Sequence, residues 1–374
     1  MEGNKGMQNG SKPPERSKWL RRILWLFLSA AALMAAFVVK LMYDGGEFKS
    51  LKPHFAGTVR MIDGIIGAED ITIDHQKQVA YISADDRHSR MAGRTDALGA
   101  IYRLDLNDLS GNPQLMPREP DTPITPHGIS LFKGTDGQDY LYVIDHFQGS
   151  HRILLYAIND GNQLMLVNTF QEAQFLISPN DIVAVDQQSF YFTNDHGSQG
   201  KLGRMFEDYL QLSRSNVVFC NQGQYSIAAD GIAYANGINL SADGKRLYVA
   251  SPMGKCVLEF QRDSATGRLT DRQVRNYGTG VDNIELDEHG NLWVGCHPKL
   301  LSFIRHAGDS SRPSPSQVLR VGQTSDQRLE AEAEEVYLDE GQQISASSVA
   351  AVSGRHLLIG PVFDKKILWC QLPE

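Results

Sequence analysis

A short motif that recurs six times in this chain of 374 residues constrains its fold more than any other feature. In each copy, two polar or small residues precede an apolar run that alternates with polar residues, as a β-strand does. The first apolar residues of the six runs, here called the anchors, are Ile71, Ile129, Ile182, Ile238, Ile284 and Val349. Successive anchors lie 46–65 residues apart, and turn sequences such as SADG at residues 241–244 divide each unit into antiparallel hairpins. The pattern predicts an all-β fold, a six-bladed β-propeller.

The residue two places before each anchor is polar in all six copies. These residues are Glu69, His127, Asn180, Asn236, Asp282 and Ser347. Because one repeat position takes the same place in every blade, we expect them to converge on the central tunnel, with Asn283 alongside. Asp70 and Asp181 stand one residue further on, and strand alternation predicts that they point the opposite way.

Such a ring is rich in oxygen donors. Calcium takes six to eight oxygen ligands in irregular geometry, whereas zinc and copper need more nitrogen or sulfur. We therefore predict a cation site formed by Glu69, Asn180, Asn236, Asp282 and Asn283, and a second, deeper cation site at Asp70 and Asp181. The alternative is that Asp and Asn before strands only form turns and caps.

The N-terminal segment has the composition of a membrane anchor. Residues 23–42 are apolar apart from Lys40, and a helix of this length spans roughly the 30 Å hydrocarbon layer. A cleaved signal peptide is the alternative, although its apolar core is normally only about 7–15 residues long. Basic residues precede the run, which predicts a cytoplasmic N-terminus. We expect a cytoplasmic tail at residues 1–22, a transmembrane signal-anchor at 23–43 and a propeller at 44–374 on the extracytoplasmic side.

Charge is unevenly distributed along the chain. Residues 1–22 carry six basic side chains and two acidic ones, so the rest of the chain has a net charge of about −12. This acidic balance argues against a nucleic-acid partner and is compatible with cation binding.

One segment beyond residue 50 is predicted to be a helix, at residues 200–214 (GKLGRMFEDYLQLSR). Its apolar side either covers the tunnel mouth, rests on a membrane surface or packs on a blade.

The motifs together resemble the serum paraoxonase/arylesterase family. The resemblance covers residues 55–374 and rests on GAEDI, PHGIS, NDIVAV followed by FTNDH, ANGINLSADGK, VDNI, LWVGCHP and LLIGPVF, in this order. It implies a six-bladed propeller with two calcium ions in its tunnel that hydrolyses lactones and aryl esters. Uncleaved N-terminal hydrophobic segments also occur in this family.

The resemblance also implies roles for individual residues. A catalytic calcium would be held by Glu69, Asn180, Asn236, Asp282 and Asn283, and a structural calcium by Asp70, Asp181 and the backbone carbonyl of Ile129. His127 corresponds to the family's proposed base and His146 to its partner. Asp195 and His196 match a further pair that lines the site.

The chain departs from the family pattern in two places. The family generally joins a Cys upstream of the GAED motif to one near the C-terminus. Here Cys370 has the C-terminal position, but no Cys precedes Cys220. The ring then closes by strand pairing alone, or Cys370 pairs elsewhere. The loop at residues 85–99 also departs from the pattern, which leaves the substrate range open.

The residues favour one kind of chemistry over others. The chain has neither a G-x-S-x-G elbow nor an H-E-x-x-H motif. Calcium can polarise an ester carbonyl, and a neutral His127 held by His146 can take a proton from water. We predict a calcium-dependent lactonase or arylesterase, a carboxylic ester hydrolase. The alternatives are a non-catalytic calcium-stabilised propeller that binds a partner or assists membrane-protein assembly, and a condensation like that of strictosidine synthase.

Overall fold

The computed structural model describes residues 15–94, 97–108 and 110–373, and the chain divides into two units at Asp44. The first unit contains the helix α1 (Glu15–Asp44), whose segment Lys18–Asp44 is long and apolar enough to cross a membrane. The predicted apolar run at residues 23–42 lies inside this helix. The second unit, Gly45–Glu374, is built mostly of β-sheet.

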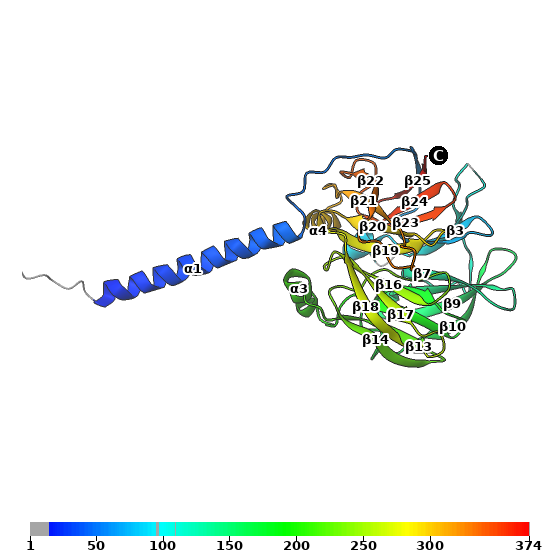
Figure 1. The fold of residues 1–374 in the computed structure, drawn as a ribbon, viewed down its shortest axis with the longest axis horizontal. Helices are drawn as coiled ribbons and strands as arrows, with labels where there is room; N and C mark the ends of the chain where they lie inside the picture. Colours follow the sequence, from blue (N-terminus) through cyan, green and yellow to red (C-terminus); the bar gives the residue numbers. More distant parts are fainter. Residues whose placement is uncertain (1–14, 95–96, 109, 374) are drawn as a thin grey trace, which may run out of the picture. The chain divides into compact units, whose positions relative to one another are not determined.

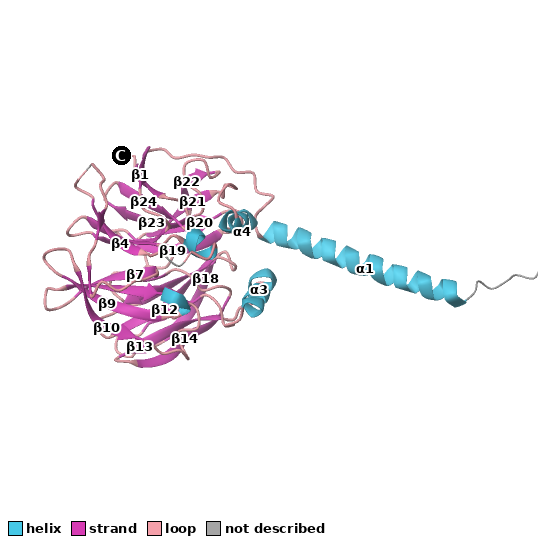
Figure 2. Ribbon diagram, turned by 180° about the vertical axis from the view of Figure 1, so that it is seen from behind, coloured by secondary structure: helices cyan, strands magenta, loops and turns pink. Residues whose placement is uncertain are grey.

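Within the described residues, the strands of the second unit form six antiparallel sheets that are the blades of a propeller (Figures 1 and 2). Each blade is given from the strand that carries its anchor outwards. The first blade is β2 (Ala68–Asp74), β3 (Val79–Ala84), β4 (Ala100–Asp105) and β5 (Gln114–Leu115). The second is β7 (Pro126–Lys133), β8 (Asp139–Asp145), β9 (Arg152–Ile158), β10 (Leu164–Phe170) and β6 (Arg118–Glu119), of which β6 is parallel to β10. The third is β11 (Pro179–Ala184), β12 (Ser189–Asn194), β13 (Ser215–Asn221) and β14 (Gln224–Ile232). The other three are β15 (Ile238–Leu240), β16 (Arg246–Ser251), β17 (Cys256–Arg262) and β18 (Leu269–Asn276); β19 (Gly280–Leu286), β20 (Leu292–His297), β21 (Ser316–Val321) and β22 (Glu334–Asp339); and β23 (Ser347–Ser353), β24 (His356–Pro361), β25 (Lys366–Gln371) and β1 (Thr58–Asp63).

The six strands that carry the anchors surround the axis of the propeller. Each contacts the next around a closed circle, in the order β2, β7, β11, β15, β19, β23 and back to β2. All six anchors are at most 2% exposed, because they pack between neighbouring blades. The predicted six-bladed propeller is confirmed.

Two glycines show how tightly the inner strands approach each other. A Cβ on Gly128 would lie 2.5 Å from the Cα of Asp181 in the next blade, and one on Gly237 would lie 2.5 Å from the carbonyl oxygen of Asp282. Both positions directly precede an anchor. Glycine therefore stands there because any side chain would push two blades apart.

The ring closes through strand pairing. Strand β1, from the start of the propeller, pairs antiparallel with β25 from its end over six positions, Thr58 with Gln371 through Asp63 with Lys366. Each of the four cysteines lies in the described part of the chain and is a buried free thiol. Of the two alternatives for Cys370, closure by strand pairing alone is the one that the structure shows.

The described residues also form the helices α2 (Arg87–Met91), α3 (Lys201–Leu210), α4 (Leu300–Gly308) and the single turn η1 (Phe147–Gly149). The helix predicted at residues 200–214 is α3, which is shorter. Its apolar side does not pack on a blade, because Leu202 and Phe206 are 70% and 56% exposed while Glu207 is buried. The predicted alternative that α3 packs its apolar side on a blade is therefore wrong. Polar contacts hold the helix in place instead, since Glu207 accepts from the Gly197 N–H and Asp208 pairs with His196.

Candidate active site

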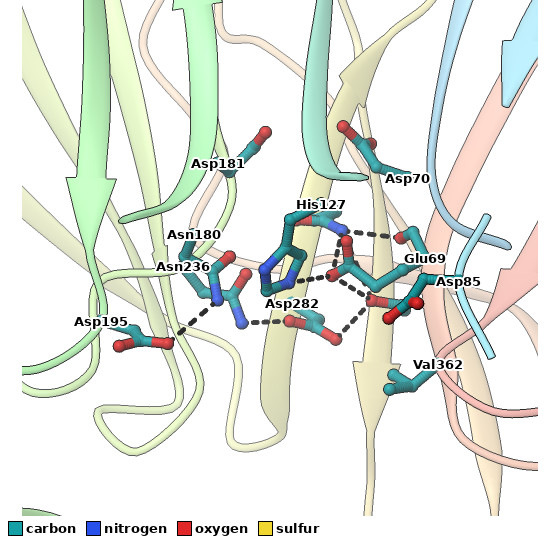
Figure 3. A network of polar contacts seen from close by, with 12 residues as sticks. Glu69, Asp70, Asp85, His127, Asn180, Asp181, Asp195, Asn236, Asp282 and Val362 are labelled. Atoms are coloured by element: carbon teal, nitrogen blue, oxygen red, sulfur yellow. Dashed lines mark hydrogen bonds and ion pairs between the residues drawn. The ribbon is translucent and has the colours of Figure 1, made fainter. Parts of the chain in front are cut away.

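The polar residues before the anchors lie on β-bulges. In β2, β7, β11, β19 and β23 the pairing register with the next strand shifts directly before the anchor, and β15 begins only at its anchor. A bulge leaves an extra residue unpaired and changes the direction of the side chains around it. Neighbouring residues such as Glu69 and Asp70 can therefore both reach the tunnel. Figure 3 shows Asp70 and Asp181 pointing away from Glu69 and Asn180, as the sequence predicted.

One level of the tunnel, here called the upper level although Figure 3 draws it below Asp70 and Asp181, gathers the first predicted set of residues. Figure 3 shows Glu69, His127, Asn180, Asn236 and Asp282 side by side, with His127 within ion-pair distance of Glu69 and Asn180 bonded to Asp195 outside the set. Asn236 donates to Asp282, and Asn283 donates to Glu69 Oε1 at 3.0 Å. Ser348 bridges Glu69 and Asp282 with distances of 3.0 and 2.8 Å.

Four buried oxygens at this level have no hydrogen-bond donor among the residues that the structure describes. They are Glu69 Oε2, Asn180 Oδ1, Asn236 Oδ1 and Asn283 Oδ1. The amide nitrogens of the three asparagines are already used as donors to Asp195, Asp282 and Glu69, so their oxygens are what remains for a ligand. An unsatisfied buried polar group costs about 1–3 kcal/mol, which a bound cation would remove.

The nature of these donors fits a hard cation. The described residues contain no group of three or more His, Cys, Asp or Glu placed to hold a metal. Three of the four free oxygens belong to asparagine amides, so most of the donors at this level are neither carboxylates, imidazoles nor thiolates. Oxygen-only donors of mixed charge suit calcium.

Asp70 and Asp181 form a second level of the tunnel, apart from the first set in Figure 3. Asp70 accepts from the backbone N–H groups of Ile71 and Ile129, at 2.8 and 2.7 Å. Asp181 accepts in the same way from Ile182 and Ile238, at 2.7 and 2.8 Å. Each carboxylate thus joins its own blade to the next one. Ile129 contacts Asp70 through its backbone N–H group. The role of calcium ligand that was predicted for its carbonyl oxygen stays a prediction.

Both carboxylates of this level are destabilised in their charged form. Burial and the nearby charge of Glu69 raise the pKa of Asp70 to about 8. Burial and the charge of Asp70 raise the pKa of Asp181 well above its ordinary value. A cation between them would remove this penalty, so the second predicted cation site also fits its residues.

His127 begins a row of three imidazoles. Its Nδ1 lies 3.0 Å from His146 Nε2, and His146 Nδ1 lies 2.7 Å from His151 Nδ1. The other ring nitrogen of His127, Nε2, is 3.4 Å from Glu69 Oε1. Burial and the neighbouring His127 lower the pKa of His146 well below 6.5, so His146 is neutral. The sequence indicated the pair but not His151, which the turn η1 brings back beside His146.

A cavity of about 220 Å³ opens beside the upper level. Its wall includes the predicted cation ligands Glu69, Asn180, Asn236 and Asp282. The other wall residues are Arg87, His127, Asp195, Asp208, Tyr234, Pro252, Met253, His297, Leu300, Phe303, Ile304 and Val362. A separate cavity of about 380 Å³ reaches Asp181 and Ile129 of the second level and none of the upper ligands. The smaller cavity is therefore the candidate active site, because it alone joins the ligand set to His127.

Several wall residues were not predicted from the sequence. Helix α4 supplies Leu300, Phe303 and Ile304, and Phe303 stacks on His297 with ring centres 4.1 Å apart. His297 Nε2 lies 2.8 Å from Asp282 Oδ2 and orients that carboxylate. In the sequence, His297 was marked only by its place in the LWVGCHP motif. Helix α4 does not follow the six-fold repeat, so its residues could not be predicted to line the site.

His196 links the cavity wall to α3. Its Nδ1 lies 2.6 Å from Asp195 Oδ1 and its Nε2 lies 2.9 Å from Asp208 Oδ1, so it bonds to two carboxylates. Burial opposes a charge on this ring, but the two carboxylates outweigh it and raise the pKa to about 9. The protonated ring therefore ties α3 to the blade that carries Asp195.

This pair of contacts predicts a pH dependence of stability. A histidine whose pKa is raised on folding contributes fully below its ordinary pKa of 6.5, and the contribution is lost as the pH rises through about 9. We expect His196→Gln to lower the melting temperature most near pH 6, with the difference from wild type shrinking towards pH 9.5. Thermal melts in saturating calcium measure it. A difference that stays constant over this range would show that His196 is not charged.

Comparison with known proteins agrees with this geometry. The family model described as Arylesterase matches residues 47–372. Serum paraoxonase/arylesterase 1 of Homo sapiens is 32% identical over 333 residues, covering 87% of this chain and 91% of the human protein. Serum paraoxonase/lactonase 3 of Homo sapiens is 30% identical over 311 residues, covering 82% and 86%.

Solved structures show the same fold at lower identity. A luciferin-regenerating enzyme has a TM-score of 0.55 at 14% identity, covering 84% of this chain and 95% of that one. A gluconolactonase from Xanthomonas campestris has a TM-score of 0.52 at 17% identity, covering 87% and 96%. The family match over most of the residues and the relatives that are at least 30% identical show that this chain belongs to the arylesterase family.

Proposed function

We propose that this protein is a calcium-dependent hydrolase of carboxylic esters, a lactonase or arylesterase. Membership of the arylesterase family supports a lactonase or esterase activity. The observation that carries the finer proposal is the group of buried oxygens without donors beside His127, in a cavity small enough for one lactone ring.

Two calcium ions account for the two levels of the tunnel. Glu69, Asn180, Asn236, Asp282 and Asn283 would hold the catalytic ion. Asp70, Asp181 and the carbonyl of Ile129 would hold the structural one. The catalytic ion, when bound, supplies a Lewis acid for the ester carbonyl and stabilises the negative charge that develops on its oxygen.

His127 is the proposed base. We assign His146 as the neutral partner that accepts from His127 Nδ1–H and donates its own Nδ1–H to His151 Nδ1, in accord with the short distances between these atoms and the lowered pKa of His146. This direction of hydrogen bonds leaves His127 Nε2 unprotonated. Nε2 can then take the proton of a water molecule as the water oxygen attacks the ester carbon. It returns this proton to the alcohol oxygen when the ester C–O bond breaks, which leaves the acid and the alcohol as products. His146 acts through His127 as a positioning residue, because it fixes this tautomer.

We expect His127→Gln to lower kcat for lactones by about 100-fold or more, because general-base catalysis contributes about 10²–10⁴. Calcium affinity and the melting temperature should stay close to wild type, since no ligand oxygen is removed. Steady-state kinetics, calorimetric calcium titration and thermal melts measure these effects. His289→Gln, the same substitution at an exposed position, is the control. Near-full turnover in His127→Gln would show that another group accepts the proton.

The proposal as a whole is tested by measuring hydrolysis of γ- and δ-lactones, acyl-homoserine lactones and phenyl acetate, with and without calcium. Turnover of any of them that is lost in chelator and restored by calcium supports it. Absence of turnover from the calcium-loaded protein would favour the non-catalytic propeller that binds a partner.

The apolar helix α1 suggests membrane association, and we propose that it is an uncleaved single-pass anchor with a cytoplasmic N-terminus. The exposed apolar side of α3, which includes Leu202, Met205 and Phe206, would be a second contact with the membrane surface.

A further inference from the structure

We propose that Arg87 forms an anion subsite in the wall of the active-site cavity, so that the preferred ester or lactone carries a carboxylate. This inference rests on the proposed hydrolase function and specifies the substrate class of the same site. It comes from the loop at residues 85–99, where the sequence departs from the family pattern.

The backbone holds the guanidinium of Arg87 in the cavity wall. The side chain is 11% exposed, and its NH1 donates to the carbonyl oxygens of Gly67 at 3.2 Å and Val362 at 3.4 Å. Val362 also lines the cavity. Two carbonyl acceptors on one nitrogen fix the plane of the group and leave Nε and NH2 to face other partners.

The carboxylates near Arg87 do not use up these donors. Glu69 Oε2 is 3.7 Å from NH2 and Asp85 Oδ2 is 3.9 Å from Nε, and both distances are longer than a hydrogen bond. Asp85 is paired more closely with Arg90, at 2.6 Å. Glu69 Oε2 is one of the oxygens assigned to the catalytic cation. Arg87 therefore lies within ion-pair distance of Glu69 and Asp85 but keeps N–H donors that no hydrogen bond to these carboxylates uses.

The other side of the cavity carries negative charge. Asp195 and Asp208 lie in its wall and share the one positive charge of His196, which leaves a net negative charge there. Figure 3 shows Asp195 across the ligand ring from Asp85, the acidic neighbour of Arg87. This distribution would orient an anionic substrate, with its carboxylate at Arg87 and away from the aspartates. The planar guanidinium matches a carboxylate in geometry as well as charge.

The cavity also limits the size of the substrate. Its volume of about 220 Å³ is below the range of about 300–1,000 Å³ that is usual for drug-sized ligands. A lactone ring with one short charged substituent is a compound of suitable size.

The test compares γ-butyrolactone with 5-oxotetrahydrofuran-2-carboxylate, the same ring with a carboxylate attached. We expect Arg87→Gln to lower kcat/KM for the carboxylate lactone by about 10- to 100-fold, the usual worth of a charge-assisted hydrogen bond. For γ-butyrolactone the change should stay within about threefold. Gln retains an amide donor for the carbonyls, so the loop keeps its support. Arg94→Gln removes the same charge from the same loop at a side chain that is 63% exposed. With this control variant, kcat/KM for each of the two lactones should stay at the wild-type value.

Binding provides a readout that does not depend on turnover. Calorimetric titration of the calcium-loaded protein with benzoate and benzamide should show benzoate affinity falling about tenfold or more in Arg87→Gln, with benzamide unchanged. If Arg87→Gln slows both lactones equally and weakens calcium binding, Arg87 only supports Glu69 and the subsite is refuted. Unchanged values for both lactones and for benzoate refute it too. If the wild type hydrolyses neither lactone but benzoate binding still requires Arg87, the proposed function fails and the subsite stands.

Discussion

Removal of calcium from the purified protein is expected to abolish ester hydrolysis and to lower the melting temperature by roughly 15 °C. Each ion at a thousandfold excess over its dissociation constant stabilises a protein by about 4 kcal/mol, so the two proposed ions contribute about 8 kcal/mol, and each kcal/mol shifts the melting temperature of a large domain by about 2 °C. Without the ions, burial and neighbouring carboxylates raise the pKa values of Asp70 and Asp181, so their charged forms cost stability. Calorimetry in chelator, with metal analysis to prove removal, measures the effect.

Substitutions at the two levels of the tunnel should separate the loss of ester hydrolysis from the loss of thermal stability. Asp282→Asn removes a charge from the upper level, so it should cost most of the activity while much of the thermal stability remains. Asp181→Asn acts on the second level, where the carboxylate accepts from the N–H groups of Ile182 and Ile238 in adjacent blades. It should lower the melting temperature more strongly than Asp282→Asn. Magnesium should not replace calcium, because it demands a smaller, octahedral site. A melting temperature that does not change after proven calcium removal would contradict the structural ion.

The repeat made most of the fold predictable from the sequence. Ile71 and the five other anchors recur because each inner strand must bury the same position against the next blade, so a local pattern carries the global symmetry. Closure of the ring was not predictable in the same way. The pairing of Thr58–Asp63 with Lys366–Gln371 joins the two ends of the propeller, and only the positions of the cysteines in the sequence bore on it.

The site was predictable as far as it follows the repeat. Glu69, Asn180, Asn236 and Asp282 occupy one repeat position and meet at one level of the tunnel. The bulges before the anchors were not predictable, because a bulge gives no signal in an alternating pattern. Residues outside the repeat, such as Arg87 and Phe303, reach the cavity from loops and short helices whose positions depend on tertiary packing.

The second large effect that we expect concerns two truncations at the N-terminus. Deletion of residues 1–44 should release a soluble propeller that keeps its calcium and its esterase activity, because the second unit begins at Gly45. The cut should not lie further along the chain. The Gly45 carbonyl accepts from the Leu300 N–H at 2.8 Å, and Glu47 accepts from the Ser302 N–H at 2.9 Å.

Deletion of residues 1–64 should instead prevent stable folding. It removes β1, leaves the backbone of β25 without its outer partner and exposes Trp369 and its neighbours. It also removes the buried Ile62, and a net loss of about 1 kcal/mol for each broken backbone hydrogen bond adds to the loss of buried apolar surface. Since no disulfide links the ends of the described chain, no covalent bond would hold the ring closed. Expression, fractionation and circular dichroism of both truncations measure the difference.

The two results together assign roles to the two units. A folded 1–64 deletion would mean that β1 is dispensable for closing the ring. An unfolded 1–44 deletion would mean that α1 is part of the fold and would refute the proposed anchor. If the 1–44 deletion is folded but stays in the membrane fraction, Leu202→Gln with Phe206→Gln should release it, since these exposed side chains lie on α3. Failure to release would refute α3 as the second membrane contact, because its apolar side would then not hold the protein on the lipid.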